Sequence, residues 1–261
     1  GKYISLFEEA FSKFNSTSYS IAVSNGSVAL ILALKALDIK YGDEVIVPNI
    51  TFSATINSII NVGAKPVLVD INDTNWTIDT EQIEKKITKK TKAIIIVHLY
   101  GNVVHLDRIK KISKKYKLKV IEDCAEAHGA KYNNTKVGNF SDVGCFSFYG
   151  NKIFTTGEGG ICCTNKKKIF KKLKILRDQG LDTKKFNNLS SKKYYCNDYG
   201  FNFRMTNLQA AIGFSQLQKA SKILNERKKI ENLYKYYLSK NKYISFSENE
   251  KNAVPVNWLF T

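Results

Sequence analysis

The sequence predicts an α/β fold in which helices cover both faces of a mainly parallel β-sheet. Between residues 21 and 163, short apolar runs alternate with longer segments of helical periodicity, as in proteins whose strands and helices follow one another in turn. Residues 93–98 are apolar almost throughout, which is typical of a strand buried on both faces. Parallel strands bring their carboxyl ends to one edge of the sheet, so functional residues are expected there.

Turns separate the first segments of this pattern. An Asn-Gly-Ser turn at residues 25–27 leads into residues 28–37, whose three Ala-Leu pairs favour a helix. A Gly-Asp turn precedes a short strand at residues 44–48. Residues 51–61 then have the pattern of a helix, and a Gly-Ala-Lys-Pro turn leads into a strand at residues 67–70.

The pattern continues with a polar helix at residues 79–87 and the buried strand at residues 93–98. Residues 106–116 predict an amphipathic helix with lysines on its polar face, and a strand at residues 119–122 ends at Asp123. The remaining predicted elements are strands at 143–148 and 160–164, a helical and loop-rich stretch at 165–195, and a long helix or helix pair at 206–235.

We expect two domains of unequal size. Residues 1–230 contain the whole alternating pattern and are expected to form a large α/β domain. Residues 231–261 are interpreted as the beginning of a smaller C-terminal domain, because residues 243–261 start an element that they do not finish. The chain is therefore expected to be a fragment.

Composition is that of a globular protein, with 43% hydrophobic and 12% aromatic residues in 261. The net charge of +18 raises the possibility of a nucleic-acid partner. However, the basic residues are mostly dispersed lysines, and arginine, which suits phosphate and base contacts best, occurs only at positions 108, 177, 204 and 227. We therefore expect no nucleic-acid partner. No apolar run is long enough to span a membrane.

The five cysteines are an odd set without C-x-x-C spacing. Cys162 and Cys163 are adjacent on a predicted strand and so point to opposite faces, which suits neither a disulfide nor a shared metal. Reduced thiols in a cytoplasmic protein are the simplest interpretation. The histidines and cysteines show no metal-ligand spacing, and the chain contains no P-loop, G-x-G-x-x-G or G-x-S-x-G motif.

Lys152 differs from the other lysines in its neighbours. Aromatic residues precede it and a Gly-rich turn at residues 157–160 follows it, which is an unusual setting for a solvated surface cation. A lysine amine in a partly desolvated pocket becomes a usable nucleophile, as Schiff-base chemistry requires. Lys152 is therefore the candidate catalytic amine.

Other candidates follow the ends of predicted strands. Gly26 and Ser27 stand at a strand–helix junction whose free N–H groups suit a phosphate, although an N-capping serine gives the same pattern. Ser147 offers a further hydroxyl for such a phosphate. Phe52 is suited to lie against a planar ring, or to be a core aromatic residue. Asp123 needs a cationic partner, for which a protonated pyridine nitrogen would serve, unless it is simply a helix N-cap.

Three runs of sequence together resemble the DegT/DnrJ/StrS aminotransferases. They are Glu-Asp-Cys-Ala-Glu-Ala-His-Gly-Ala at residues 122–130, Phe-Ser-Phe-Tyr-Gly-Asn-Lys at residues 146–152, and Thr-Gly-Glu-Gly-Gly at residues 156–160. Further matches extend the resemblance over nearly the whole chain. The members are pyridoxal-phosphate (PLP) enzymes of fold type I with a seven-stranded sheet, and they aminate keto groups on nucleotide-linked sugars. The resemblance implies this fold and PLP, or its amine form PMP, as cofactor.

The resemblance also implies a role for each candidate. Lys152 would form the Schiff base with the cofactor and later move a proton between cofactor and sugar. Asp123 would bind the pyridine nitrogen. The phosphate would be held by Gly26, Ser27 and Ser147, and one face of the ring would be covered by Phe52.

Two further positions carry expectations from the family. Asn202 matches the asparagine that reaches the phosphate of the neighbouring subunit's cofactor, which implies a homodimer with shared active sites. Glu126 stands where many members have Gln near the ring oxygen of the cofactor. Together with the Tyr-Gly-Asn-Lys run, Glu126 resembles the members that aminate a GDP-linked 4-keto-6-deoxysugar with glutamate as donor, for cell-surface polysaccharide. Another 3- or 4-aminotransferase for nucleotide ketosugars, and a PLP-binding dehydratase or regulatory relative, remain as alternatives.

Overall fold

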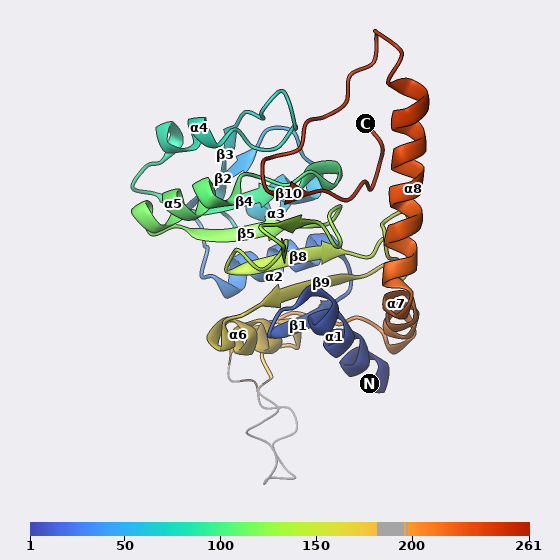
Figure 1. The fold of residues 1–261 in the computed structure, drawn as a ribbon. Helices are drawn as coiled ribbons and strands as arrows, with labels where there is room; N and C mark the ends of the chain where they lie inside the picture. Colours follow the sequence, from blue (N-terminus) through green and yellow to red (C-terminus); the bar gives the residue numbers. More distant parts are fainter. Residues whose placement is uncertain (182–195, 197) are drawn as a thin grey trace.

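The computed structural model describes residues 1–181, 196 and 198–261, and a seven-stranded sheet lies at its centre (Figure 1). The strand order is β1-β9-β8-β5-β4-β2-β3. Strand β9 runs antiparallel to its neighbours β1 and β8, and every other neighbouring pair in the sheet is parallel. The predicted α/β class with a mainly parallel sheet is confirmed. The strands of the sheet are β1 (Tyr19–Val23), β2 (Glu44–Pro48), β3 (Lys65–Val69), β4 (Thr91–Val97), β5 (Lys119–Asp123), β8 (Val143–Ser147) and β9 (Gly160–Thr164).

Helices pack on both faces of the sheet. They are α1 (Lys2–Asn15), α2 (Gly26–Ala36), α3 (Ser53–Asn61), α4 (Thr80–Ile83), α5 (Leu106–Tyr116), α6 (Lys167–Arg177), α7 (Asn207–Gln218) and α8 (Ala220–Leu238), with short 3-10 turns η1 (Glu84–Lys86) and η2 (Leu99–Gly101). A small second sheet joins β10 (Ala253–Val254), β6 (Lys131–Tyr132) and β7 (Thr135–Lys136).

Alternating side chains divide the core into two layers. In β4, Ile94 and Ile96 pack with α1, α5 and α7, whereas Ala93 and Ile95 pack on the opposite face with α2, α3 and α6. This alternation with period two is what a strand between two helical layers requires. The same alternation in β9 places Cys163 in the first layer and Cys162 in the second, so the two thiols point to opposite faces as predicted from the sequence. Among the described residues these thiols and those of Cys124 and Cys145 are buried and form no disulfide.

Several predicted boundaries were wrong, and one helix was missed. Helix α2 begins at Gly26 rather than near residue 28, because the Asn25 side chain caps it by accepting the Val28 N–H at 2.9 Å. The polar helix at residues 79–87 is a four-residue helix followed by a 3-10 turn. Residues 206–235 form two helices that meet at Lys219, which confirms the helix-pair alternative. Part of the stretch predicted at 165–195, residues 182–195, lies outside the described residues.

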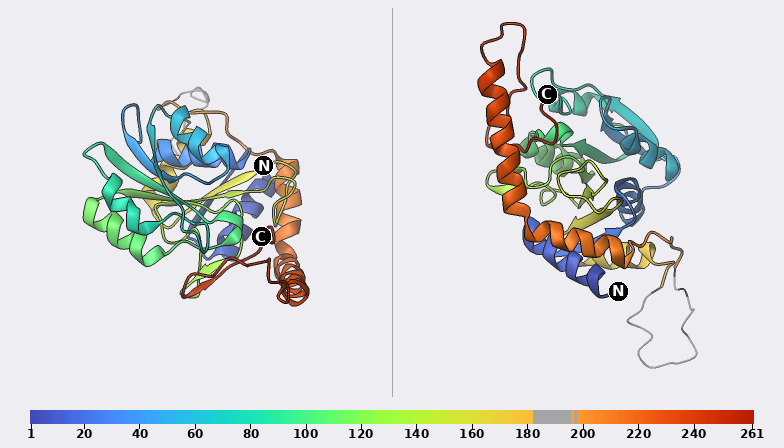
Figure 2. Two further views of the ribbon diagram at one scale, coloured as in Figure 1. Left: turned by 90° about the horizontal axis from the view of Figure 1, so that it is seen from above. Right: turned by 90° about the vertical axis from the view of Figure 1, so that its right-hand side faces the viewer.

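The missed helix is α1, which packs along α7 (Figure 2). Its buried side chains include Phe7 and Phe11, and the Phe11 ring lies 4.8 Å from that of Phe146 on β8. A Cβ on Gly213 of α7 would lie 2.6 Å from the Phe7 ring, so glycine permits the close approach of the two helices.

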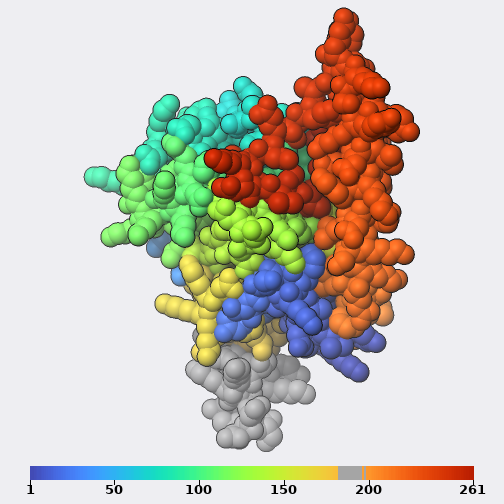
Figure 3. Space-filling model, in the orientation of Figure 1, coloured from blue at the N-terminus to red at the C-terminus, as the bar shows by residue number. Residues whose placement is uncertain are grey.

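After α8, the chain returns toward the sheet and lies across the middle of the molecule (Figure 3, red). Ala253 pairs with Tyr132 of β6, and the Val256 N–H donates to the Gly101 carbonyl at 3.3 Å. Helix α8 is continuous across residue 230. The division into a large domain at residues 1–230 and the beginning of a small domain at residues 231–261 stays a prediction. Among the described helices, none has the length and apolar character needed to cross a membrane.

His128 makes the fold sensitive to acid. Its fully buried ring lies 5.3, 5.1 and 5.6 Å from the rings of Phe146, Phe148 and Phe154. Burial, helped by the positive charge of Lys152, lowers the pKa of His128 to about 3. The folded protein therefore resists protonation that the unfolded chain accepts below about pH 6.5.

The contribution of His128 to the free energy of unfolding is complete above pH 6.5. It is lost as the pH falls toward 3, at about 1.4 kcal/mol per pH unit. Urea unfolding should show about 3 kcal/mol of this loss by pH 4 in the wild-type chain. In a His128→Phe variant, the free energy of unfolding should fall by about 3 kcal/mol less between pH 7 and pH 4, whatever its value at pH 7. Identical pH slopes for the two proteins would contradict the assignment.

Candidate active site

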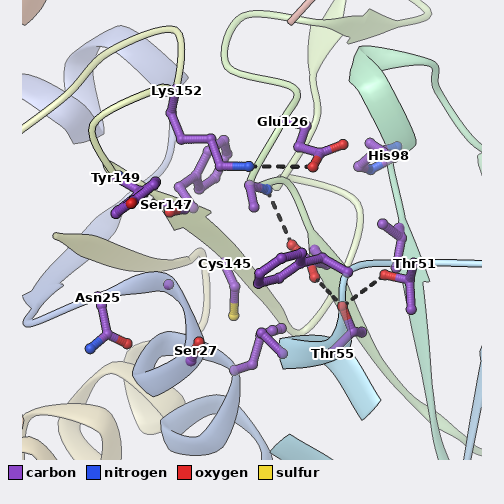
Figure 4. Close-up of a pocket in the computed structure, with 18 of the residues that line it drawn as sticks. Asn25, Ser27, Thr51, Thr55, His98, Glu126, Cys145, Ser147, Tyr149 and Lys152 are labelled. Carbon is purple, nitrogen blue, oxygen red and sulfur yellow. Dashed lines mark hydrogen bonds and ion pairs between the residues drawn. The ribbon is translucent and has the colours of Figure 1, made fainter. Parts of the chain in front are cut away.

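A pocket of about 520 Å³ opens at the carboxyl ends of the parallel strands. Such a volume suits a ligand of cofactor size. Seven of the eight predicted site residues line it, namely Gly26, Ser27, Phe52, Asp123, Glu126, Ser147 and Lys152. They come from four separate parts of the chain, so the sheet topology brings them together, as Figure 4 shows for those it labels.

Lys152 points into the pocket from the loop after β8 (Figure 4). Its side chain is only 12% exposed, and its Nζ lies 3.3 Å from Oε1 of Glu126, which is 8% exposed. The second oxygen of Glu126 accepts the Tyr100 N–H at 2.7 Å. Burial raises the pKa of Glu126, while the Lys152 charge and the Tyr100 N–H oppose this shift. The lysine amine is thus held at a fixed place within the pocket.

Asp123 occupies the last position of β5, between Val97 of β4 and Cys145 of β8. Its Oδ1 accepts the Ala125 N–H at 3.1 Å, and its Oδ2 accepts the Thr55 hydroxyl at 2.8 Å. Burial raises the pKa of Asp123, and these two hydrogen bonds offset only part of the shift. The carboxyl group therefore favours a cationic partner in the pocket, as a protonated pyridine nitrogen would provide.

The opposite side of the pocket is formed by the start of α2 and the end of β8. Helix α2 has eleven residues, and the free N–H groups of its first turn, at Gly26 and Ser27, attract anions. A Cβ on Gly26 would lie 2.8 Å from the Cβ of Ser147, so only glycine lets the start of α2 and the end of β8 approach this closely. This arrangement fits the phosphate group of PLP.

Phe52 and Asn202 lie differently from the buried candidates. Phe52 precedes the first residue of α3 and is 71% exposed at the pocket rim, so it is not a core residue. Asn202 does not line this chain's pocket. It is exposed, on a segment that forms a bridge with Asp178.

Two further residues of the site, Thr55 and Trp258, were not predicted from the sequence. Thr55 holds Asp123, and its hydroxyl lies 2.9 Å from that of Thr51 (Figure 4). Thr55 lay within the helix predicted at residues 51–61, but no local pattern indicated that its hydroxyl would reach Asp123. Trp258 lines the pocket from the far end of the sequence, and no local pattern pointed to it.

A buried cluster of His98, Glu122 and Cys124 has metal-ligand types within 4.8 Å of one another. The side chains of His98 and Glu122 are already hydrogen-bonded within the fold. Glu122 accepts the His98 Nε2–H at 3.1 Å and two backbone N–H groups at 2.7 and 2.9 Å, while His98 Nδ1 accepts the Val104 N–H. Burial raises the pKa of the Cys124 thiol well above its usual range, so the thiolate that a metal would bind is disfavoured. The cluster supports β5 rather than a metal.

The DegT/DnrJ/EryC1/StrS aminotransferase family matches the chain over residues 1–261. This chain belongs to that family. It is 42% identical over 259 residues to GDP-perosamine synthase of Escherichia coli O157:H7, covering 99% of this chain and 69% of that protein.

Solved structures agree with this assignment. The aminotransferase from Psychrobacter cryohalolentis has a TM-score of 0.92 and 34% identity, over 99% of this chain and 68% of that one. NtdA from Bacillus subtilis, solved with bound PMP, has a TM-score of 0.88 and 35% identity, over 100% of this chain and 58% of that one. The chain thus spans between about three fifths and two thirds of the length of these relatives. The family fold is the predicted PLP-dependent transferase fold, and PLP is the cofactor that this site accommodates.

Thr55 should govern how strongly the site holds its cofactor. Thr55→Val keeps the side-chain shape but removes the hydroxyl that donates to Asp123, so the pKa of Asp123 should rise further and less of it should be ionised. Because a hydrogen bond to a charged group is worth about 1.5–3 kcal/mol, we expect PLP affinity to fall by about tenfold or more. Absorbance titration with PLP measures this. Thr55→Ser, which keeps the hydroxyl, should bind nearly normally, and equal losses in both variants would contradict the role.

Proposed function

We propose that this chain transfers an amino group from glutamate to the keto carbon of a nucleotide-linked 4-keto-6-deoxysugar. The observation that carries the proposal is a single pocket lined by Lys152, Asp123 and the anion-binding start of α2. When bound there, PLP supplies an electron sink that stabilises a carbanion next to the transferred nitrogen. The similarity to GDP-perosamine synthase supports a GDP-linked sugar with amination at C4.

The side chains of this chain have distinct tasks in such a reaction. Lys152 takes and returns protons at Nζ, because its amine projects into the pocket beside Glu126. Asp123 keeps negative charge at the opposite side, where Thr55 and the Ala125 N–H orient it. The start of α2 binds the phosphate and so fixes the cofactor's position relative to Lys152.

Two half-reactions test the proposal separately. PLP-loaded protein incubated with glutamate should release 2-oxoglutarate. Nucleotide ketosugars with GDP, dTDP or UDP are then offered, and the amine should appear on C4 of GDP-4-keto-6-deoxymannose. Release of 2-oxoglutarate with amination of a different sugar would overturn the substrate and favour another sugar aminotransferase. Bound PLP without any 2-oxoglutarate would overturn amino transfer and favour a non-aminating relative.

We also propose that the working enzyme is a homodimer in which Asn202 of each subunit completes the neighbour's phosphate site. The exposure of Asn202 and of the pocket-rim residues Phe52 and Tyr149 supports this arrangement. Mixing inactive Lys152→Ala and Asn202→Ala subunits should restore part of the activity, because hybrid dimers then contain one intact site. No recovery in a mixture shown to contain hybrids would contradict a shared site.

A cytoplasmic location and a role in making cell-surface polysaccharide such as O-antigen are part of the same proposal. Buried thiols without a disulfide among the described residues support a reducing compartment. Cell fractionation tests the location, and the loss of the amino sugar from surface polysaccharide in a deletion strain tests the role. Recovery of the protein outside the cytoplasm, or unchanged polysaccharide, would contradict them.

A further inference from the structure

Trp258 contacts the catalytic amine directly. The Lys152 Nζ lies 3.7 Å from the centre of the Trp258 ring and 3.3 Å from Oε1 of Glu126. A carboxylate and an aromatic face both attract an ammonium group. The amine thus has two partners of different kinds, one of them 106 residues away in the sequence.

The position of Trp258 is fixed by the loop that carries the lysine. The indole Nε1–H donates to the carbonyl of Asn151, the residue before Lys152, at 2.7 Å. The backbone of the same segment is held by Arg227 of α8, whose Nη1 donates to the carbonyls of Asn257 and Trp258 at 3.4 and 3.1 Å. The hydrogen bond to Asn151 therefore fixes the position of the indole ring relative to Lys152.

The short turn η2 supports both partners of the amine. The Tyr100 N–H donates to Glu126, and the Tyr100 ring is nearly parallel to that of Trp258, at 15° with 6.3 Å between centroids. A Cβ on Gly101 would meet the Val256 carbonyl oxygen at 1.5 Å, so glycine is required for the C-terminal segment to reach this turn. The contacts form a closed ring through Tyr100, Glu126, Lys152 and Trp258.

We infer that Trp258 is a positioning residue that, together with Glu126, holds the amino group of Lys152 in place for proton transfer. The inference rests on the proposed function for its kinetic consequence, but the contact itself does not depend on it. A lysine side chain has many rotamers, and confining the amine between two partners reduces the entropy lost when it reaches the reacting carbon.

The contact can be measured without cofactor or substrate. The chain has two tryptophans, so in a Trp76→Phe variant Trp258 is the only source of tryptophan emission. In PLP-free protein of this background, Lys152→Met should change the intensity or wavelength of the emission. Lys172→Met, which removes a lysine paired with Asp38 elsewhere on the chain, should not. Identical emission with and without the Lys152 amine would overturn the inference.

The kinetic consequence is measured as exchange of the α-hydrogen of glutamate in deuterated water by PLP-loaded protein. Removing the aromatic face in Trp258→Leu should slow exchange by roughly five- to thirtyfold, with PLP affinity and urea midpoint changed much less. Trp258→Phe, which keeps a weaker aromatic face, should lie between. Trp76→Leu is the matched control, because Trp76 also packs against Tyr100, at 5.9 Å, but does not line the pocket.

The results separate the inference from the proposed function. Equal slowing by Trp76→Leu and Trp258→Leu, or slowing that only parallels lost PLP binding, would overturn a positioning role. If wild-type protein shows no exchange, the proposed function fails, and the emission result alone then decides whether Trp258 holds the amine.

Discussion

Replacing Lys152 by alanine should lower the rate of amino transfer by at least about a thousandfold, since the variant loses both the nucleophile and the proton carrier. Among the described residues, Lys152 is the only lysine that lines the pocket, where it lies beside Glu126 in a lining that also contains Asp123. The measurement is the single-turnover rate of 2-oxoglutarate formation from glutamate by PLP-loaded protein. PLP should still bind, because the phosphate site at α2 is untouched.

The matched control is Lys229→Ala, which removes an exposed lysine of α8 that pairs with Glu226. Such a surface pair contributes little to stability, and its loss should leave the rate unchanged. A Lys152→Ala protein that retains a tenth or more of the wild-type rate would contradict the catalytic role of this residue.

Asp123→Asn should slow amino transfer by about 10²–10³-fold, in line with the loss of a preorganised electrostatic partner. Asparagine is close in size to aspartate and leaves Thr55 and the Ala125 N–H with a hydrogen-bonding neighbour, so the main change is the loss of negative charge. Without that charge the pyridine nitrogen is not kept protonated, and the ring is a weaker electron sink. Single-turnover kinetics with glutamate measure the rate, and borohydride trapping shows whether Lys152 still reacts with PLP.

Asp142→Asn is the corresponding control. Asp142 is also a buried acid near the central strands, but it accepts the Val120 N–H at 2.9 Å and does not line the pocket. This variant should lose stability and keep its rate per folded molecule. If Asp142→Asn slowed the reaction as much as Asp123→Asn, the effect would be general to buried acids and the assignment would be wrong.

The parts of the fold and site that could be predicted have local causes. Strand β4 is apolar from Ala93 to its end, and α5 has an amphipathic period, so each was found with little or no error. Asp123 and Lys152 stand next to recognisable strand ends and turns. Once the strands are parallel, the sheet itself brings such positions to one edge.

What could not be predicted depends on distant contacts. Helix α1 is stabilised by packing on α7 and β8, segments far away in the sequence. Trp258 reaches Lys152 only because the segment after α8 returns toward the sheet (Figure 1). The predicted contact of Asn202 with a neighbouring subunit stays a prediction, because one chain alone does not contain it. Thr55 lay within a predicted helix, but the direction of its hydroxyl followed from the position of Asp123 on another strand.

Whether Lys152 is the amine that reacts with PLP can be decided by reducing the PLP-loaded protein with borohydride and mapping its peptides. We expect a visible absorption band after PLP addition and a single stable label on the peptide that contains Lys152, absent from Lys152→Ala. Label spread over the many exposed lysines, or concentrated on a different one, would contradict it.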